Sequence, residues 1–399
     1  MVEVVTQEDV AGWDMDLRAL TDGLGWMFNR PEPKRVFGDF VRGLLSDAPK
    51  KNAWGLADHL GYKSPISFQH LMYGASWDAD VLRDQVRSYA IEALGDERAV
   101  LVLDDTQAIK KGTKSVGVAP QHCGVTGDTR NCQVMVMLTY ASEHGHAFID
   151  RELYLPAEWT SDPARLKEAG VPADRVFLTK PQLAVGELER AADSGAPFEA
   201  LVADSGYGRD PALRECCHDR SLSYALGVPV DLPLVLPDGG ATRPDRLHRV
   251  LPAGVWERWS LGAGSKGERA YDWARVAVHV KEQCATDGFE HSLLIRKSKQ
   301  PVRGRTGKLA FEFAYFLVHA PIGTATATIM RWLGLRWAVE EDNKLGKDVF
   351  GLDGYQVRKW VSWYRHVTCS MLAHAFTAAK RAELGKEQDR TAHGEALRT

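Results

Sequence analysis

Three acidic residues stand where their carboxylates could share a cation. Asp104 lies near the end of the apolar run "AVLVLDD", Asp204 ends the run "ALVAD", and Glu340 lies in "LRWAVEEDNKLGKDVFG". Three carboxylates within a few ångströms cannot all stay ionised without a counter-charge. All-oxygen ligands suit Mg²⁺ or Mn²⁺ better than zinc, and two such ions about 3.5–4 Å apart can catalyse phosphoryl transfer. We therefore interpret these residues as candidate catalytic groups and metal ligands.

Two neighbouring acids are alternatives for these roles. Side chains alternate along a strand, so Asp104 and Asp105 point to opposite faces and either could be the first ligand. Glu341 is the rival of Glu340, but it lies about 100° away around a helix. An Asp at the end of a buried strand can also simply cap the next turn, so each residue taken alone is a weak signal.

Glu340 shares one helical stripe with two cationic residues. Arg336, Glu340 and Lys347 follow at spacings of four and seven residues. At about 100° of rotation per residue, the three point within roughly 40° of one another. The stripe is either a solvated ion-pair ladder, in which a pair contributes about 0.2–0.5 kcal/mol, or a surface that faces a polyanion beside the metal site.

Further cationic residues are candidates for contacts with DNA phosphates. One group is in "RKSKQPVRGRTGK", which contains no acid and whose glycines and proline predict a loop or hairpin tip. Cations that displace condensed counterions supply most sequence-independent DNA affinity, although a solvated basic loop is the alternative. The DNA-binding candidates beyond Arg336 and Lys347 are Lys110, Lys111, Lys114, Arg296, Lys297, Lys299, Arg303, Arg305 and Lys308.

The elements that must position these residues follow from the apolar pattern. Residues 10–96 have helical patterns throughout, including a possible helix-turn-helix pair. Short apolar runs at 99–105, 200–204 and 223–228 predict buried strands, and 133–142 with 147–156 predict a hairpin. If the strands before Asp104 and Asp204 pair in parallel, the two carboxylates become neighbours at the carboxyl ends of the strands. Residues 357–383 predict a long amphipathic helix.

Composition excludes several classes of protein. The 399 residues are 44% hydrophobic and 26% charged, which is ordinary for a globular chain with a full core. No run of eighteen apolar residues predicts a membrane span, and the acidic N-terminus lacks a basic-then-apolar signal pattern. The net charge of −3 gives no overall attraction to nucleic acid. The six cysteines form no CxxC pair, so we expect a reduced, cytosolic protein without structural zinc.

The chain resembles the DDE transposases of bacterial insertion sequences, specifically insertion-sequence family 701 within the broad family-4 group. The resemblance covers roughly residues 50–380, through "VLVLDDTQAIKKGTKSVGVAPQHCG", "IDRELYLPAEWTSDPARLKEAGVP", "VADSGYGRDPALR" and "LRWAVEEDNKLGKDVFGLDGYQVRKWVSWYRH". Arg336, Glu340 and Lys347 match three places of the broader group's Tyr-Arg-Glu-Lys signature, and Leu333 stands at the tyrosine place. The family's preference for Asp at the first place of "DDT" selects Asp104 over Asp105.

The resemblance implies a fold, a reaction and partners. It implies an RNase H-like α/β core, with a mixed five-stranded sheet and flanking helices, a β-rich insertion and an N-terminal all-helical domain. It also implies cut-and-paste transposition on double-stranded DNA (terminal inverted repeats and target), Mg²⁺ or Mn²⁺ as cofactor, a dimer on DNA, and a cytoplasmic, nucleoid-associated protein. The expected segments are 1–97 (helical, DNA binding), 98–228 (first part of the core), 229–325 (β-rich insertion), 326–385 (C-terminal helical part of the core) and 386–399 (flexible tail).

Two other functions remain open from the residues. A transposase-derived protein that has lost catalysis would bind DNA without cutting it. A hydrolase with paired acids, as in glycosidases, would act without a metal and would not need the basic loop.

Overall fold

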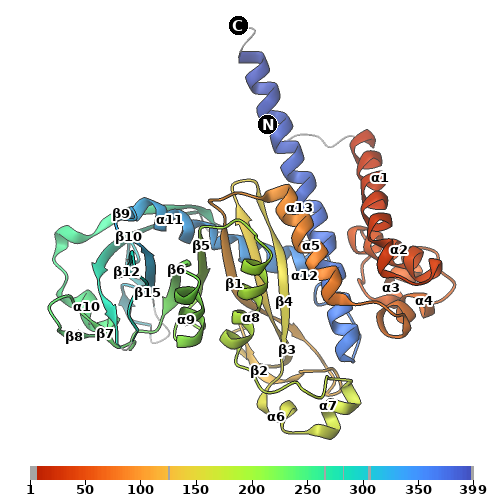
Figure 1. The fold of residues 1–399 in the computed structure, drawn as a ribbon, viewed down its shortest axis with the longest axis horizontal. Helices are drawn as coiled ribbons and strands as arrows, with labels where there is room; N and C mark the ends of the chain where they lie inside the picture. The colour runs from red at the N-terminus through yellow and green to blue at the C-terminus, as the bar shows by residue number, and fades with distance from the viewer. Residues whose placement is uncertain (1–6, 125, 265–266, 282, 304–306, 397–399) are drawn as a thin grey trace. The chain divides into compact units, whose positions relative to one another are not determined.

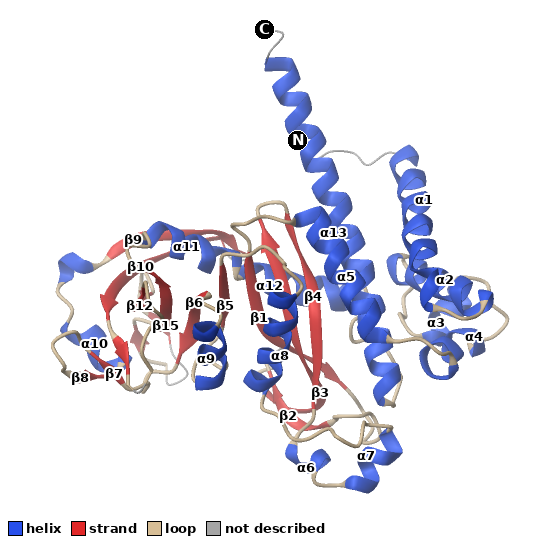
Figure 2. Ribbon diagram, viewed as in Figure 1, coloured by secondary structure: helices blue, strands red, loops and turns tan. Residues whose placement is uncertain are grey.

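The protein has a mixed α/β fold with a large mixed sheet and flanking helices (Figure 1, Figure 2). The computed structural model describes residues 7–124, 126–264, 267–281, 283–303 and 307–396. The chain divides into two compact units. Unit 1 holds the described residues up to Gly95, Asp105–Leu178 and those from Glu341 onward, and unit 2 holds Asp96–Asp104 and Thr179–Glu340. Strand β1 (Val100–Ile109) contributes its first half to unit 2 and its second half to unit 1.

Unit 2 begins with parallel strands. The first half of β1 pairs in parallel with β5 (Ala200–Ala203), and β5 pairs in parallel with β6 (Ser223–Val228). Every residue of β5 and β6 is buried, as expected of parallel strands covered on both faces. Helix α8 (Lys180–Asp193) precedes β5 and begins with a capping box, and α9 (Pro211–Asp219) joins β5 to β6. The parallel pairing predicted from the apolar runs is confirmed.

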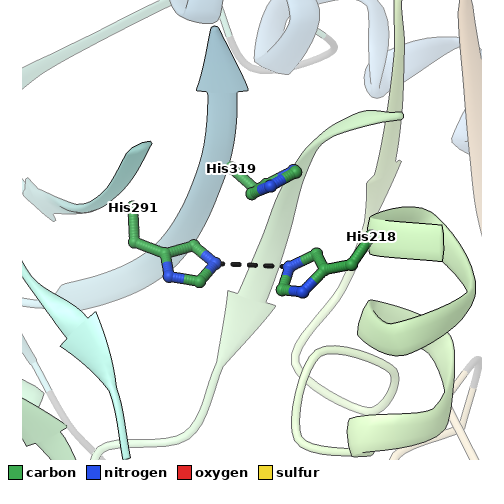
Figure 3. Close-up of side chains that lie close together, drawn as sticks. All are labelled: His218, His291 and His319. Carbon is green, nitrogen blue, oxygen red and sulfur yellow. Dashed lines mark hydrogen bonds between the residues drawn. The ribbon is translucent and has the colours of Figure 1, made fainter. Parts of the chain in front are cut away.

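The sheet of unit 2 continues with antiparallel strands. After β6 come β15 (Phe313–Pro321), β12 (Phe289–Lys297), β10 (Gly267–Ala277) and β9 (Glu257–Gly264). His319 of β15 is paired with His291 of β12 on one side and with Tyr224 of β6 on the other. Figure 3 shows these two histidines with His218 of α9. Four strands from the segment predicted to be a β-rich insertion therefore extend the main sheet.

Short elements complete unit 2 before the helix that leads to Glu340. They are β7 (Leu234–Val235), β8 (Ala241–Thr242), α10 (Pro244–Val250), the 3-10 turn η3 (Ala253–Val255), β11 (His279–Val280), β13 (Val302–Arg303) and β14 (Leu309–Ala310). Helix α11 (Thr326–Leu335) packs against β5, β6 and β9. Helix α12 (Trp337–Asp348) begins in unit 2 and ends in unit 1.

Unit 1 contains the predicted hairpin. Strands β3 (Asp128–Ser142) and β4 (Gly145–Tyr154) pair antiparallel up to Ser142 and Gly145, so the turn is the polar segment predicted from the sequence. Strand β2 (Ala119–Cys123) pairs with β3 on its first residues, and β1 is the other neighbour of β3. Eleven consecutive β3 residues from Cys132 are buried, because the strand lies in the middle of this part of the sheet.

Helices supply the rest of unit 1. The elements are α1 (Gln7–Gly23), the 3-10 turn η1 (Leu24–Met27), α2 (Pro31–Leu45), α3 (Ala53–His59), α4 (Ile66–Gln69), the π turn η2 (His70–Gly74), α5 (Ala79–Leu94), α6 (Ala157–Thr160), α7 (Pro163–Ala169) and α13 (Trp360–Ala396). The residues before 95 are helical as predicted. Helices α5 and α13 pack against each other and against β4 (Figure 1). Helix α13 includes residues 386–396, which we predicted to be a flexible tail, and 397–399 lie outside the described residues.

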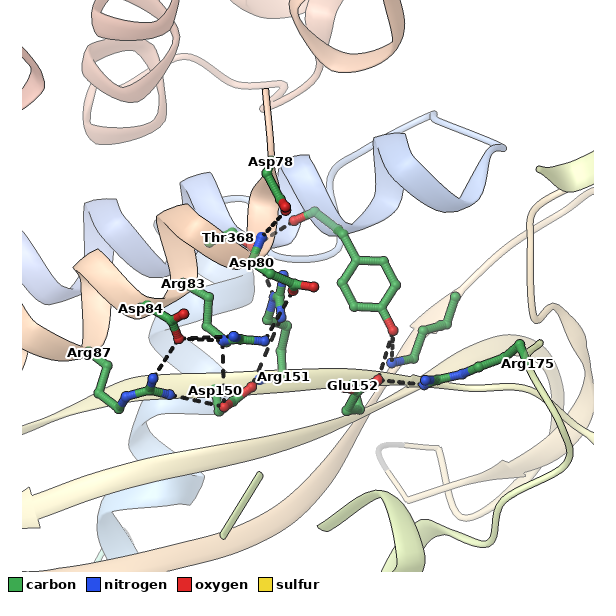
Figure 4. A network of polar contacts seen from close by, with 12 residues as sticks. Asp78, Asp80, Arg83, Asp84, Arg87, Asp150, Arg151, Glu152, Arg175 and Thr368 are labelled. Carbon is green, nitrogen blue, oxygen red and sulfur yellow. Dashed lines mark hydrogen bonds and ion pairs between the residues drawn. The ribbon is translucent and has the colours of Figure 1, made fainter. Parts of the chain in front are cut away.

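A buried ionic network joins α5 to β4 (Figure 4). The Asp150 side chain is 0% exposed, and its Oδ2 lies 3.3 Å from Arg87 Nη1 and 3.7 Å from Arg83 Nε. Arg151, also fully buried, donates to Thr368 Oγ1 of α13 (2.9 Å) and to Asp80 Oδ1 of α5 (2.8 Å). Charges held away from water in this way must be paired, so the network fixes how the helices sit on the strand.

Two further findings concern membrane-spanning helices and disulfide bonds. Among the described residues, no helix is both long and apolar enough to span a membrane. The six cysteines are all free thiols in the part of the chain that the structure describes.

Candidate active site

The parallel pairing of β1 with β5 places two of the predicted carboxylates at equivalent positions. Leu103 is paired with Ala203, so Asp104 and Asp204 are the next residues of the two neighbouring strands. Both therefore lie at the carboxyl ends of the paired segments, where catalytic groups of such sheets gather. Asp104 is half-buried and Asp204 is exposed.

The turn after β5 is packed tightly against β6 and holds Asp204 in place. The backbone N–H of Gly206 donates to Asp204 Oδ1 at 2.8 Å. A Cβ at Gly227 of β6 would lie 2.7 Å from Ser205 N and 2.8 Å from the Asp204 carbonyl carbon, and a Cβ at Gly208 would lie 2.0 Å from Gly227 O. Backbone atoms cannot yield at such distances, which explains the glycines at these two positions.

The third predicted carboxylate lies in the first turn of α12. Glu340 is 41% exposed, and Arg336 Nη2 donates to its Oε1 at 3.0 Å. Arg336 is the single turn residue between α11 and α12, so the segment predicted to be helical from residue 326 onward is interrupted at this cation. An ion pair from Arg331 to Glu199 and a hydrogen bond from Arg331 to the Arg98 carbonyl connect α11 to the starts of β5 and β1.

All three carboxylates belong to unit 2, but the structure does not bring them into one cluster. Asp104 and Glu340 are the last residues of their unit 2 segments. Two other sets of three groups have ligand atoms within 4.8 Å of one another among the described residues, and this triad is not one of them. The donors nevertheless fit Mg²⁺ or Mn²⁺ in kind, because the set offers only carboxylate oxygens and two of its members stand on adjacent strands.

The two alternative acids are engaged elsewhere, in unit 1. Asp105 Oδ1 accepts a hydrogen bond from Gln107 Nε2 at 2.6 Å. Glu341 Oε2 lies 3.3 Å from His146 Nε2. Both side chains thus contribute to contacts within unit 1.

A buried carboxylate anchors α12 one residue beyond Glu341. Asp342 is fully buried; its Oδ1 lies 2.5 Å from His146 Nδ1 and 3.2 Å from His374 Nε2 of α13. Burial opposes the charged form of Asp342, but the two imidazoles outweigh it and lower its pKa to about 2. For His146, burial and Arg381 lower the pKa, but Asp342 and Glu341 outweigh them and raise it above the ordinary value. Sequence patterns gave no indication of this cluster.

The raised pKa of His146 predicts a pH-dependent stability. The histidine's contribution is fully present below its unfolded-state pKa of about 6.5 and is lost as the pH rises through its higher folded-state pKa. We therefore expect His146→Gln to lower the free energy of unfolding at pH 6 by more than it does at pH 9, measured by urea denaturation. His144→Gln, at an exposed position two residues earlier, should show no such difference. An equal loss for His146→Gln at both pH values would contradict the prediction.

The predicted DNA-contacting residues are placed in different ways. Arg303 and Lys308 flank a short hairpin of β13 with β14 and are exposed, as is Lys299, and Arg305 lies outside the described residues. Arg296 lies over the Tyr271 ring at 4.6 Å, and Lys297 lies over the Phe311 ring at 4.3 Å. Both residues are half-buried.

The lysines after Asp104 differ more from the prediction. Lys110 Nζ donates to the carbonyl oxygens of Asp353 (3.1 Å) and Tyr355 (3.0 Å), and burial lowers its pKa to about 8. The ammonium group of Lys110 therefore forms hydrogen bonds within unit 1. Lys114 forms an exposed ion pair with Glu168 at 2.9 Å, and Lys111 is exposed. Lys347 is half-buried and lies near Asp353. Burial raises the pKa of the Asp353 carboxyl, and the charge of Lys347 only partly opposes this shift.

Comparison with known sequences identifies the family to which the chain belongs. The chain belongs to the DDE superfamily endonuclease family, whose sequence model matches residues 26–285. The match includes Asp104 and Asp204 and ends before Glu340.

A named relative is more specific. Over 167 residues the chain is 28% identical to the "probable transposase for insertion sequence element IS701" of Microchaete diplosiphon, an alignment that covers 42% of this chain and 41% of that protein. Among solved structures, the NurA nuclease from Sulfolobus solfataricus aligns with 74% of this chain and 98% of its own chain at 10% identity. The TM-score of that alignment is 0.29, which carries no argument about the fold.

Proposed function

We propose that the protein is a DNA transposase that cleaves the ends of an insertion sequence and joins them to target DNA by a cut-and-paste route. The observation that carries the proposal is the parallel register of β1 with β5, which sets Asp104 beside Asp204 at the strand ends. The named relative, a probable transposase, supports the same substrate class. The large mixed sheet with its flanking helices is also consistent with an RNase H-like core.

Asp104, Asp204 and Glu340 would hold the divalent cations, Mg²⁺ or Mn²⁺. When bound, such ions activate a water or hydroxyl nucleophile and stabilise the leaving oxygen in phosphoryl transfer. Gly206 orients the Asp204 carboxylate through its N–H group. The Arg336–Glu340 pair is exposed and contributes only about 0.2–0.5 kcal/mol, so exchanging this partner for a cation costs Glu340 little. Arg336 would then be released to contact a phosphate.

The direct test uses the purified full chain and DNA that carries the ends of its element, taken from inverted repeats that flank the reading frame. We expect nicking at these ends with Mg²⁺ and none after EDTA treatment. Binding without cleavage in Mg²⁺ would instead favour a catalytically silent DNA-binding protein. Hydrolysis that resists EDTA would favour a metal-independent acid/base hydrolase. Because two ends must be joined to one target, we expect at least a dimer in the DNA complex.

The basic hairpin tip should contribute to affinity for any DNA sequence. Replacing Arg303 and Lys308 with alanine should weaken binding to end DNA and unrelated DNA alike, because phosphate contacts are independent of sequence. Each lost contact should make the slope of log K against log salt less steep by about 0.9, so the double variant should change it by about 2. Fluorescence anisotropy across a salt series measures the slope. An unchanged slope would show that this hairpin does not contact DNA.

A further inference from the structure

Three histidines from distant parts of the chain converge in unit 2, apart from the carboxylates discussed above. His319 and His291 are paired across neighbouring antiparallel strands, so their side chains lie on the same face of the sheet. His218 comes from α9, and Figure 3 shows its imidazole approaching the other two rings from the helix side. One nitrogen of each ring lies within 4.8 Å of the others. His291 and His319 are buried and His218 is half-exposed.

The spacing of two ring nitrogens matches a tetrahedral metal site. His218 Nε2 and His291 Nε2 are 3.3 Å apart. Two nitrogens bound tetrahedrally to Zn²⁺ at about 2.0–2.1 Å are separated by roughly 3.3–3.4 Å, the edge of that tetrahedron. The hydroxyl oxygen of Tyr224 lies 3.2 Å from both nitrogens. Two imidazole nitrogens and a phenol oxygen are therefore already at the mutual distances of ligands around one ion.

The surroundings of the His319 ring resemble the outer shell of a metal site. His319 Nδ1 donates to the Leu222 carbonyl at 3.0 Å, which directs the lone pair of its Nε2 away from that carbonyl. A backbone carbonyl on the far nitrogen is the usual way in which metal-binding histidines are oriented. The His319 Nε2 lone pair accepts from the Thr286 N–H at 3.2 Å, and a metal at this nitrogen would replace that hydrogen bond.

Burial shifts the pKa of all three imidazoles in the same direction. Burial, with smaller contributions from the neighbouring cationic groups and rings, lowers the pKa of His291 to about 3. Burial also lowers the pKa of His319 to about 4 and shifts that of His218 in the same direction. His291 Nδ1 is buried and makes no hydrogen bond, so this ring is not held in place by polar contacts on its far side.

We propose that His218, His291 and His319 form a binding site for a divalent transition-metal cation of the Zn²⁺ class, which clamps α9 onto strands β12 and β15. Nitrogen donors select this class over the Mg²⁺ class expected at the carboxylates. Tyr224 or a water would provide the fourth ligand. The site is independent of the proposed function, because a DNA-binding protein without catalysis could hold the same cation.

The test is metal binding by the full chain after treatment with EDTA and dialysis. Zn²⁺ alone is added, and bound metal is counted by mass spectrometry after gel filtration. Co²⁺ is then substituted, since four-coordinate cobalt absorbs visible light far more strongly than six-coordinate cobalt. We expect the wild-type protein to hold one equivalent of Zn²⁺ tightly and to show the strong absorption bands of four-coordinate cobalt. Its melting temperature should also rise on addition of Zn²⁺.

Matched variants locate the ion. His218→Ala, at a half-exposed helix position where truncation leaves the strands intact, should lose one equivalent, the cobalt bands and the thermal shift. His144→Ala, an exposed histidine, and Asp204→Asn, in the proposed carboxylate site, should retain all three. The proposal is overturned if the wild-type protein holds no such equivalent, or if folded His218→Ala and His319→Gln, checked by circular dichroism, both bind and absorb as the wild type does.

Discussion

Asp104→Asn and Asp204→Asn are each expected to lower the rate of end cleavage by about 10³-fold or more, with DNA binding nearly unchanged. An amide keeps the size of the side chain and removes the charge that holds a divalent cation. Metal ions supply several kcal/mol of charge stabilisation in the transition state, and a loss of about 4 kcal/mol corresponds to about 10³-fold. Neither residue is deeply buried, so the fold should tolerate the change. Single-turnover nicking and electrophoretic binding assays separate the two effects.

The neighbouring acids provide matched controls for this prediction. Glu340→Gln should lower the cleavage rate as strongly as the two aspartate substitutions do. Asp105→Asn and Glu341→Gln should retain most of the cleavage activity, because these side chains contact Gln107 and His146. A large loss of cleavage activity in Asp105→Asn, with little loss in Asp104→Asn, would show that Asp105 is the first metal ligand. Loss of DNA binding in parallel with cleavage in every variant would indicate damage to the fold.

Asp150→Ala is expected to destabilise the protein by about 3–5 kcal/mol. Asp150 is fully buried between Arg83 and Arg87, whose side chains are only 8% and 7% exposed. Removing one member of a buried ionic network leaves the desolvated arginines without their buried counter-charge, which costs far more than the net contribution of the pair. Urea denaturation at pH 7 gives the free energy of unfolding.

Asp84→Ala is the control for Asp150→Ala. Asp84 pairs with the same two arginines, but its side chain is 46% exposed, so water can replace it. We expect a loss of about 0–1 kcal/mol, as for other exposed pairs. Similar losses for the two variants would show that burial does not govern the energetics of this network.

Much of the fold follows from local sequence signals. The apolar runs before Asp104 and Asp204 predict buried strands, and β1 and β5 do pair in parallel. The hairpin of β3 and β4 turns at the polar segment between Ser142 and Gly145, as the alternating pattern indicates. Strands and hairpin turns depend on residues that are close together in the sequence, and patterns of apolar and polar residues reveal features on that scale.

The remaining features depend on contacts between distant segments. The cluster of His218, His291 and His319 requires the register of β12 with β15 and the placement of α9, and no spacing in the sequence encodes either. Lys110 follows Asp104 closely enough to suggest a phosphate contact, yet its ammonium group donates to carbonyls of residues 353 and 355. The interruption of the helix at Arg336 is equally hidden, since its surroundings have a continuous helical pattern.

The measurement that tests the central claim most directly is the binding of Mn²⁺ to the full chain bound to a pre-cleaved transposon end, followed by electron paramagnetic resonance. If carboxylates remote in sequence ligate a shared cation, Asp104→Asn, Asp204→Asn and Glu340→Gln should each release Mn²⁺ that the wild-type complex and Asp105→Asn retain. Mn²⁺ binding that is identical in the wild type and all three variants would contradict the assignment of these residues as metal ligands.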